Sequence, residues 1–135
     1  MRTPLNPPGV FPPRGNYVHA VVVSAPTLVF VAGQTAVDER GDVVGKDDIE
    51  VQARQVFRNL QVILEAAGSS LQDIVSWTIY DTDPDAHRAA ISRVSGEVMG
   101  GVYPASSRIG VTRLAHPDYL LEIDVVAIVP AERPV

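Results

Sequence analysis

Residues 52–75, QARQVFRNLQVILEAAGSSLQDIV, contain the strongest structural pattern in the chain. Just before them, Asp47 is followed three residues later by Glu50, the spacing of a capping box, which predicts that a helix begins there. Apolar residues then recur every three or four positions, as on one face of a helix. They are Ala53, Val56, Phe57, Leu60, Ile63, Leu64 and Ala67. Gly68 supplies a left-handed stop, and residues 71–80 are predicted to form a strand.

A second helix is predicted after this strand. Asp83 is suited to the N-cap and Pro84 to the first helical position. The buried face of this helix is predicted to carry His87, Ile91, Val94 and Val98. Gly100 and Gly101 end the helix. Two further strands, over residues 107–113 and 119–129, are predicted to close the chain.

The N-terminal part has a different composition. The first 13 residues hold five of the eleven prolines, which excludes helix and interior strand and predicts an extended arm. Residues 18–24 and 27–33 are β-rich and apolar, and Ala25-Pro26 separates them, so we predict a hairpin with a tight turn. The second of these segments is apolar on both alternations and is therefore predicted to be a central strand, buried on both faces.

The order ββαβαββ predicts an α+β fold in which two helices cover one face of a single sheet. The length of 135 residues suits one domain spanning residues 1–135. The other face of the sheet would stay open. Val21, Val23, Val29 and Val31 offer more apolar surface than two helices can cover, which predicts self-association.

Composition excludes several classes of function. The chain carries 16 acidic against 11 basic residues, and the bases are scattered, so nucleic acid is a poor partner. No apolar run approaches the roughly 18 residues of a membrane span, and prolines interrupt the N-terminus where a signal peptide needs an apolar core, so we predict a cytoplasmic protein with no membrane partner. The absence of cysteine excludes a thiol nucleophile, and the three histidines lack metal-ligand spacing, so no metal is predicted.

Four stretches resemble motifs of the Rid (reactive intermediate deaminase, or YjgF) family. GNYVHA at 15–20 is similar to G-P-Y-S-Q-A, and FVAGQTAVDERGDVVG at 30–45 to F-x-S-G-Q with its glycine-punctuated loop. Residues 52–75 are similar to the family's helix and strand, and PASSRIG with LLEIDVVA, within 103–127, to P-A-R-S and E-I-E. The resemblance implies a chorismate-mutase-like fold, a homotrimer around a β-barrel core and pockets between subunits. It also implies hydrolysis of reactive enamines and imines to 2-keto acids and ammonia without a cofactor.

The same resemblance nominates site residues. Glu122 matches the family glutamate that orients water, and it lies between apolar neighbours, where a charge is costly unless it is used or paired. A salt-bridged edge carboxylate is the alternative reading. Tyr17 matches the pocket tyrosine. Gly33 matches the glycine at which a ligand approaches the backbone, and Ala32 replaces the serine before it.

Ser106 occupies the position of the family's substrate-clamping arginine. A serine hydroxyl cannot form the two-pronged cationic grip on a carboxylate. Arg108 lies two residues further on, and the period of a strand puts it on the same face. Three interpretations stay open: Arg108 is a relocated clamp, it pairs with Glu122 across neighbouring strands, or it faces solvent.

Three more positions are candidates for the pocket. His19 replaces the family glutamine and shares a strand face with Tyr17, so it is either a pocket acid or base or a hydrogen-bonded histidine. Ile91, or Ala90 if the alignment slips by one, stands where the family has a helix asparagine. Trp77 fits the core better than a ligand platform.

Three functions follow from these residues. The first is hydrolysis of an imine or enamine by water that Glu122 orients. The second is an enzyme of a specialised pathway that steers cyclisation, condensation or tautomerisation of an imine-type intermediate. The third is a non-catalytic trimer that binds a small metabolite or a partner protein. An RNA-cleaving role finds no support in an acidic chain without paired histidines.

Overall fold

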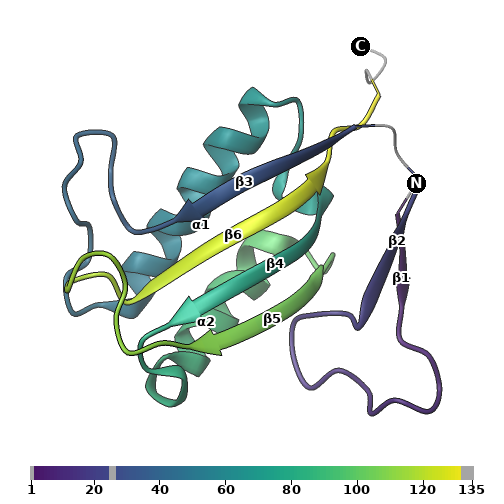
Figure 1. The fold of residues 1–135 in the computed structure, drawn as a ribbon, viewed down its shortest axis with the longest axis horizontal. Helices are drawn as coiled ribbons and strands as arrows, with labels where there is room; N and C mark the ends of the chain where they lie inside the picture. Colours follow the sequence, from purple (N-terminus) through teal and green to yellow (C-terminus); the bar gives the residue numbers. More distant parts are fainter. Residues whose placement is uncertain (1, 25–26, 132–135) are drawn as a thin grey trace.

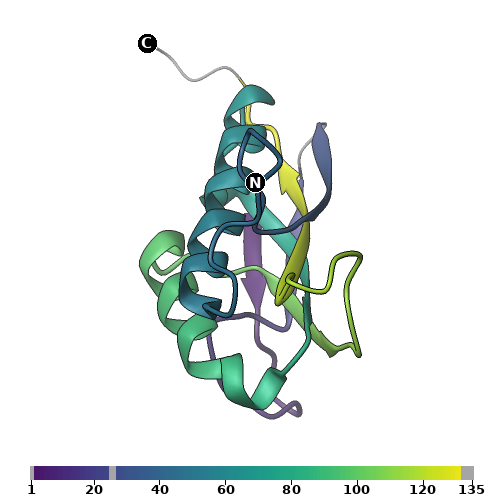
Figure 2. The same ribbon diagram turned by 90° about the vertical axis from the view of Figure 1, so that its left-hand side faces the viewer.

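Two helices cover one face of a four-stranded sheet in the computed structural model, which describes residues 2–24 and 27–131 (Figures 1 and 2). The strands lie in the order β3-β6-β4-β5. They are β3 (Leu28–Gln34), β6 (Leu121–Ile128), β4 (Ile74–Asp81) and β5 (Ala105–Gly110). Among the strand pairs of this sheet that the structure describes, only β4 and β5 run parallel. The predicted α+β class, with both helices on one face, is confirmed.

Local signals place both helices. Helix α1 (Ile49–Ala66) begins after Asp48, whose Oδ1 accepts from the Val51 amide at 3.1 Å. The prediction of Asp47 as the cap was wrong by one residue, because Asp47 adopts a left-handed φ of 60° outside the helix. Helix α2 (Pro84–Met99) is capped by Asp83 as predicted. A 3-10 turn, η1 (Leu71–Asp73), fills the start of the segment predicted as strand before β4.

The core lies between the helices and the sheet. Its largest fully buried side chains include Phe57, Leu60 and Leu64 of α1 and Ile91 of α2. Because neighbouring residues of a strand point to opposite faces, β4 and β6 each divide their side chains between the helices and the open face. The helix-facing residues are Trp77, Ile79, Ile123 and Val125, all buried.

The predicted N-terminal hairpin is wrong. β2 (Ala20–Val23) pairs with β1 (Arg2–Leu5) in a separate two-stranded sheet, and β3 pairs with β6. The proposed turn at 25–26 lies outside the described residues. The arm therefore contains a strand, and its Pro4 is tolerated because a two-stranded sheet has only edges. Arg2 anchors this sheet, since its guanidinium donates to the carbonyls of Ile74 and Tyr103.

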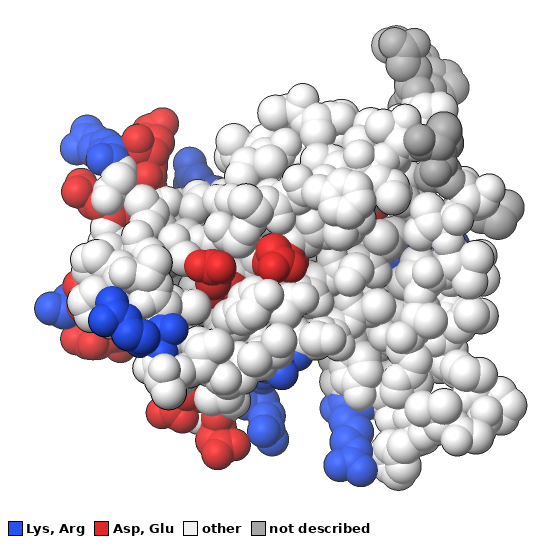
Figure 3. All heavy atoms as spheres, viewed as in Figure 1, with Lys and Arg blue, Asp and Glu red and all other residues white. Residues whose placement is uncertain are grey.

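β3 is an edge strand, so the prediction of a central strand buried on both faces is also wrong. Val29 and Val31 face the helices and belong to the core region rather than to the open face. The alternate residue Phe30 is 74% exposed instead, opposite Val126. Figure 3 shows this uncovered face as a broad surface that is largely neutral, with two acidic patches near its middle.

Two polar side chains of α1 hold the loops at one end of the sheet. The buried Gln52 donates from Nε2 to the carbonyls of Gly45 and Asp118, at 3.1 and 2.7 Å, and accepts from the Leu120 amide at 2.9 Å. Asn59 donates to the carbonyls of Thr35 and Val37. These glutamine and asparagine residues therefore act in the fold, by satisfying loop backbone groups that secondary structure leaves unpaired.

Gln52→Met should lower the free energy of unfolding by about 2 kcal/mol, because methionine keeps the volume but leaves the partly buried Asp118 carbonyl and Leu120 amide without their side-chain partner. Urea unfolding measures the change. Gln61→Met is the matched control: Gln61 is exposed on the same helix and bonds only to Glu65 among the described residues. Equal effects of the two substitutions would mean that the three hydrogen bonds of Gln52 do not hold the loops.

Candidate functional site

A cavity of about 550 Å³ lies at the outer edge of β5, between that strand, α2 and residues 14–17. Ser106 and Arg108 reach it from β5, and Trp77 and Ile79 from β4. Ile91 lines it from α2, whereas Ala90 is not among its lining residues. We refer to this cavity as the β5 pocket.

Ser106 and Arg108 share one face of β5, the face that the helices cover. Ser106 lies opposite Trp77 in the register, and Arg108 lies opposite Ile79. Arg108 is half-buried and forms no ion pair with any described residue within 4.0 Å. Burial lowers the pKa of its guanidinium, the charge of Asp81 raises it, and the charge of Arg88 lowers it further. A half-buried cation thus faces the cavity without a direct counter-ion.

Tyr17 lines the same pocket and His19 does not. The Tyr17 hydroxyl accepts from the Arg14 amide at 3.4 Å, and its ring meets that of His19 edge-on at 5.9 Å. His19 Nε2 lies 2.6 Å from the Phe11 carbonyl oxygen, and the His19 amide donates to Asn6. His19 is therefore a hydrogen-bonded histidine that contacts the N-terminal arm and the ring of Tyr17.

Glu122 lies on the opposite, open face of the sheet. Glu122 lies opposite Tyr80 of β4, whereas Arg108 lies opposite Ile79, the residue before Tyr80. Strand β4 also separates β6 from β5. The predicted pairing of Arg108 with Glu122 across neighbouring strands is therefore wrong within one chain, since the two side chains leave opposite faces of strands that are not neighbours.

Gly33 packs directly against Glu122. A Cβ added at Gly33 would lie 2.7 Å from the Glu122 carboxyl carbon, closer than real side chains approach. Ala32 and Gly33 occupy an irregular part of β3, between Val31 and Gln34, where the register with β6 shifts. The bulge and the missing side chain let the carboxylate of Glu122 lie against the edge strand.

Two further polar groups accompany Glu122 on the open face. The Tyr80 hydroxyl donates to Asp124 Oδ2 at 3.4 Å. The charge of Asp124 raises the pKa of the Tyr80 phenol, burial raises it as well, and Glu122 adds a smaller effect in the same direction. These three side chains make the acidic centre of the open face.

Sequence reasoning missed a buried ionisable pair next to the β5 pocket. Asp81, at the end of β4, is fully buried, and its Oδ1 lies 2.7 Å from His87 Nδ1 and accepts from the Asp83 amide at 3.0 Å. No partner for Asp81 Oδ2 is found among the described residues. The sequence predicted His87 on the buried face of α2 but not its partner. An acidic residue at the end of an apolar strand is the sequence feature that could have indicated Asp81.

Other pocket residues were also missed. Arg14 and Asn16 come from the segment before β2, and Arg88, Ser92 and Ser95 from α2. Arg88 could have been found, because it precedes Ile91 by three residues and so shares its helical face. The remaining ones could not, since they depend on how the arm packs against α2.

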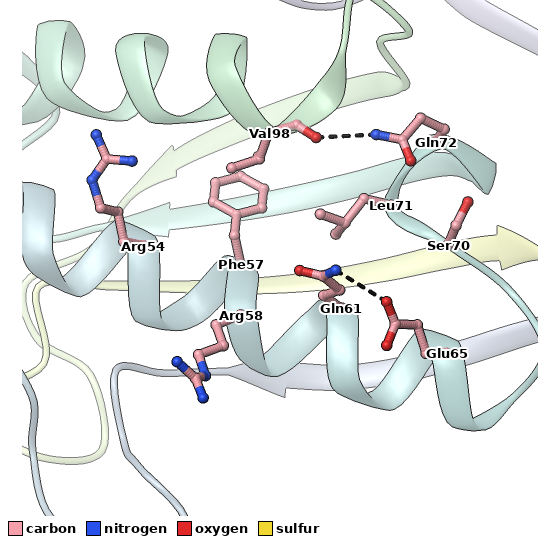
Figure 4. A pocket seen from close by; sticks show the side chains of 9 residues that line it. All are labelled: Arg54, Phe57, Arg58, Gln61, Glu65, Ser70, Leu71, Gln72 and Val98. Carbon is pink, nitrogen blue, oxygen red and sulfur yellow. Dashed lines mark hydrogen bonds between the residues drawn. The ribbon is translucent and has the colours of Figure 1, made fainter.

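Elsewhere, a cavity of about 370 Å³ lies over the outer side of the helices, lined by Arg54, Phe57, Val98 and six further residues (Figure 4). A third hollow, of about 690 Å³, lies between Gly33 and α1. The described residues bring together no group of three or more histidines and acids suited to a metal ion. Over residues 2–24 and 27–131, neither helix has the length and apolar character needed to cross a membrane.

Known proteins resemble this chain over nearly its whole length. Residues 10–129 match the family model described as Endoribonuclease L-PSP. A RutC family protein of Pyrococcus horikoshii is 38% identical over 85% of this chain and 88% of its own, and the RutC family protein YjgH of Escherichia coli is 33% identical over 97% and 98%. A solved structure of the Rid family protein YyfB from Yersinia pestis matches with a TM-score of 0.88 and 35% identity, covering 94% of this chain and 98% of that one. The chain belongs to the Rid (YjgF) family.

Proposed function

We propose that this protein hydrolyses a reactive small-molecule imine, or its enamine tautomer, in a pocket that two copies of the chain complete together. Membership of the Rid family supports a small-molecule role of the imine-deaminase type at the family level. One observation carries the finer proposal. Arg108 and Tyr17 line a pocket on the helix side of the sheet, while Glu122 and Gly33 lie on its open face, so a site that uses both pairs would need two copies of the chain.

The two halves have complementary chemistry. An arginine grips a substrate carboxylate, and a carboxylate takes a proton from water. Water adds through its oxygen to the imine carbon while the C=N electron pair moves to nitrogen. Glu122 accepts the proton that water loses and passes it to this nitrogen. The hydroxyl of the resulting carbinolamine then gives its proton to the amine nitrogen, again through Glu122, as the C–N bond breaks and the C=O bond forms. One imine and one water thus give one keto acid and one ammonia.

The open face supports self-association, which we propose gives a homotrimer. Leu28 and Phe30 of β3 expose apolar surface there, beside the acidic centre around Glu122. Burying such a surface against another copy removes apolar area from water. We propose that this contact brings Glu122 and Gly33 of one subunit to the β5 pocket of the next.

An RNA substrate has less support, although the family model carries the description of an endoribonuclease. The chain has a net charge of −5, and the open face presents Glu122 and Asp124 near its middle. Such a surface repels the phosphate backbone that supplies most of the affinity for nucleic acid. A small imine with one carboxylate fits the charges of the two half-sites better.

Subunit mixing tests the proposal. Short 2-imino acids are generated in situ by an amino-acid oxidase, and release of keto acid and ammonia is followed with wild type, Glu122→Gln and Arg108→Gln. Each variant alone should be impaired, because each lacks one half of every pocket. When the two variants are co-expressed and assemble at random, roughly a quarter of the pockets should combine two intact halves and recover activity.

The mixing result separates three cases. Recovery in co-expressed subunits, but not in variants that were assembled separately and then combined for a short time, supports pockets shared between subunits. Wild-type activity without any recovery on mixing would place both halves within one chain and overturn the shared pocket. Background rates for wild type would contradict imine hydrolysis and leave a binding role in its place.

A further inference from the structure

The β5 pocket carries an excess of positive charge. Arg14, Arg88 and Arg108 all line it, and no aspartate or glutamate is among its described lining residues. The chain as a whole has a net charge of −5. Three arginines in one cavity of an acidic protein therefore make a local field that attracts anions, against the overall charge.

The charge of Arg108, which is half-buried in the β5 pocket, is only partly compensated. The charge of Asp81 offsets only part of the effect of burial on Arg108, because the pKa of the guanidinium stays lowered overall. Asp81 also shares its Oδ1 with His87 and the Asp83 amide. Arg88 repels Arg108, so an anion bound between the two guanidinium groups would relieve both the desolvation and the repulsion.

Arg88 is also available to a ligand. Its ion pair with Asp85 is long, at 3.5 Å, and both side chains are exposed, to 69% and 97%, so the pair is weak. In the hollow over the helices in Figure 4, by contrast, the arginine Arg54 has close acidic partners. Arg54 is bonded to Glu97 at 2.8 Å and lies 3.5 Å from Glu50. The arginines of the β5 pocket lack such close partners among the described residues.

We propose that the β5 pocket selects ligands with two anionic groups, and that the substrate is an imine of a dicarboxylic acid. Arg108 binds the carboxylate next to the imine carbon, and Arg88, on α2 at the more exposed side, binds the second carboxylate. This inference rests on the proposed imine hydrolysis for the reaction, but the ligand preference follows from the arginines alone. The cavity of about 550 Å³ has room for a five-carbon diacid.

Binding of stable keto acids tests the preference without any reaction. Calorimetric titration compares 2-oxoglutarate with 2-oxopentanoate, which has the same chain length and lacks the second carboxylate. Wild type should bind 2-oxoglutarate about 10- to 100-fold more tightly, the range of one charge-assisted hydrogen-bonded pair. Arg88→Gln should abolish the difference. Arg93→Gln, which removes an exposed arginine of the same helix that pairs with Glu50, should preserve it.

Turnover gives the second readout. The imines generated from glutamate and from 2-aminopentanoate by amino-acid oxidases are compared by kcat/KM, and Arg88→Gln should remove the preference for the former. A wild type that binds both keto acids equally, or a preference that survives Arg88→Gln, would overturn the inference. Background turnover of both imines together with Arg88-dependent binding of 2-oxoglutarate would defeat the proposed hydrolysis and support the ligand class.

Discussion

Glu122→Gln is expected to lower kcat for imine hydrolysis by about 10²–10⁴-fold, the contribution of a positioned general base. The amide keeps the shape of the side chain but cannot take a proton from water. Glu122 is only partly buried on β6, so the fold should tolerate the change. Steady-state kinetics with the preferred imine measure the loss, and thermal unfolding shows whether the fold is kept.

Asp124→Asn provides the matched control. Asp124 lies two residues further along the same strand, on the same face, and its carboxylate bonds to Tyr80. Asp124→Asn removes one negative charge from the acidic centre, as Glu122→Gln does, so a general electrostatic effect would appear in both variants. If Asp124→Asn lost as much activity as Glu122→Gln, the specific role of Glu122 in proton transfer would be refuted.

His87→Ala is expected to lower the free energy of unfolding by about 1–3 kcal/mol, the cost of leaving a buried hydrogen-bonding group without its partner. Asp81 is fully buried, and His87 is only 12% exposed. Without the imidazole, the Asp81 carboxylate keeps the Asp83 amide as its one remaining hydrogen-bond donor among the described residues. Chemical denaturation at neutral pH measures the change.

The double variant Asp81→Asn with His87→Ala distinguishes the buried charge from the lost volume. It should be more stable than His87→Ala alone, because a neutral amide costs less to bury than a carboxylate. His116→Ala, on an exposed loop, should have little effect. A double variant no more stable than His87→Ala would show that packing of the imidazole, rather than the charge of Asp81, accounts for the loss.

The helices could be predicted from the sequence because their signals are local. Capping residues, a period of 3.6 and a following glycine all lie within one segment, and they placed α1 to within one residue and α2 with its cap. The partner of β3 could not be predicted in this way. A hairpin with residues 18–24 is the local solution, whereas the strand pairs with β6, nearly a hundred residues later.

In the candidate site, too, features set by local sequence could be predicted, and features set by long-range strand pairing could not. Alternation along a single strand correctly placed Ser106 and Arg108 on one face of β5. The position of Glu122 relative to Arg108 depends on how β4 aligns with both of its neighbours, and a one-residue difference in register moves a side chain to the opposite face. The sequence of β5 or β6 alone contains no information on that alignment.

The exposed edge strand β3 has a consequence for the life of the protein in a cell. Within the described residues, the outer edge of β3 has no strand partner and lies beside the exposed ring of Phe30. Such edges act as templates for pairing with other unassembled chains. If copies of the chain assemble as we propose, the rate at which they meet sets how much newly synthesised protein is lost to aggregation or to chaperones and proteases. Overproduction and heat stress should therefore cause aggregation through the edge of β3 before they unfold the core.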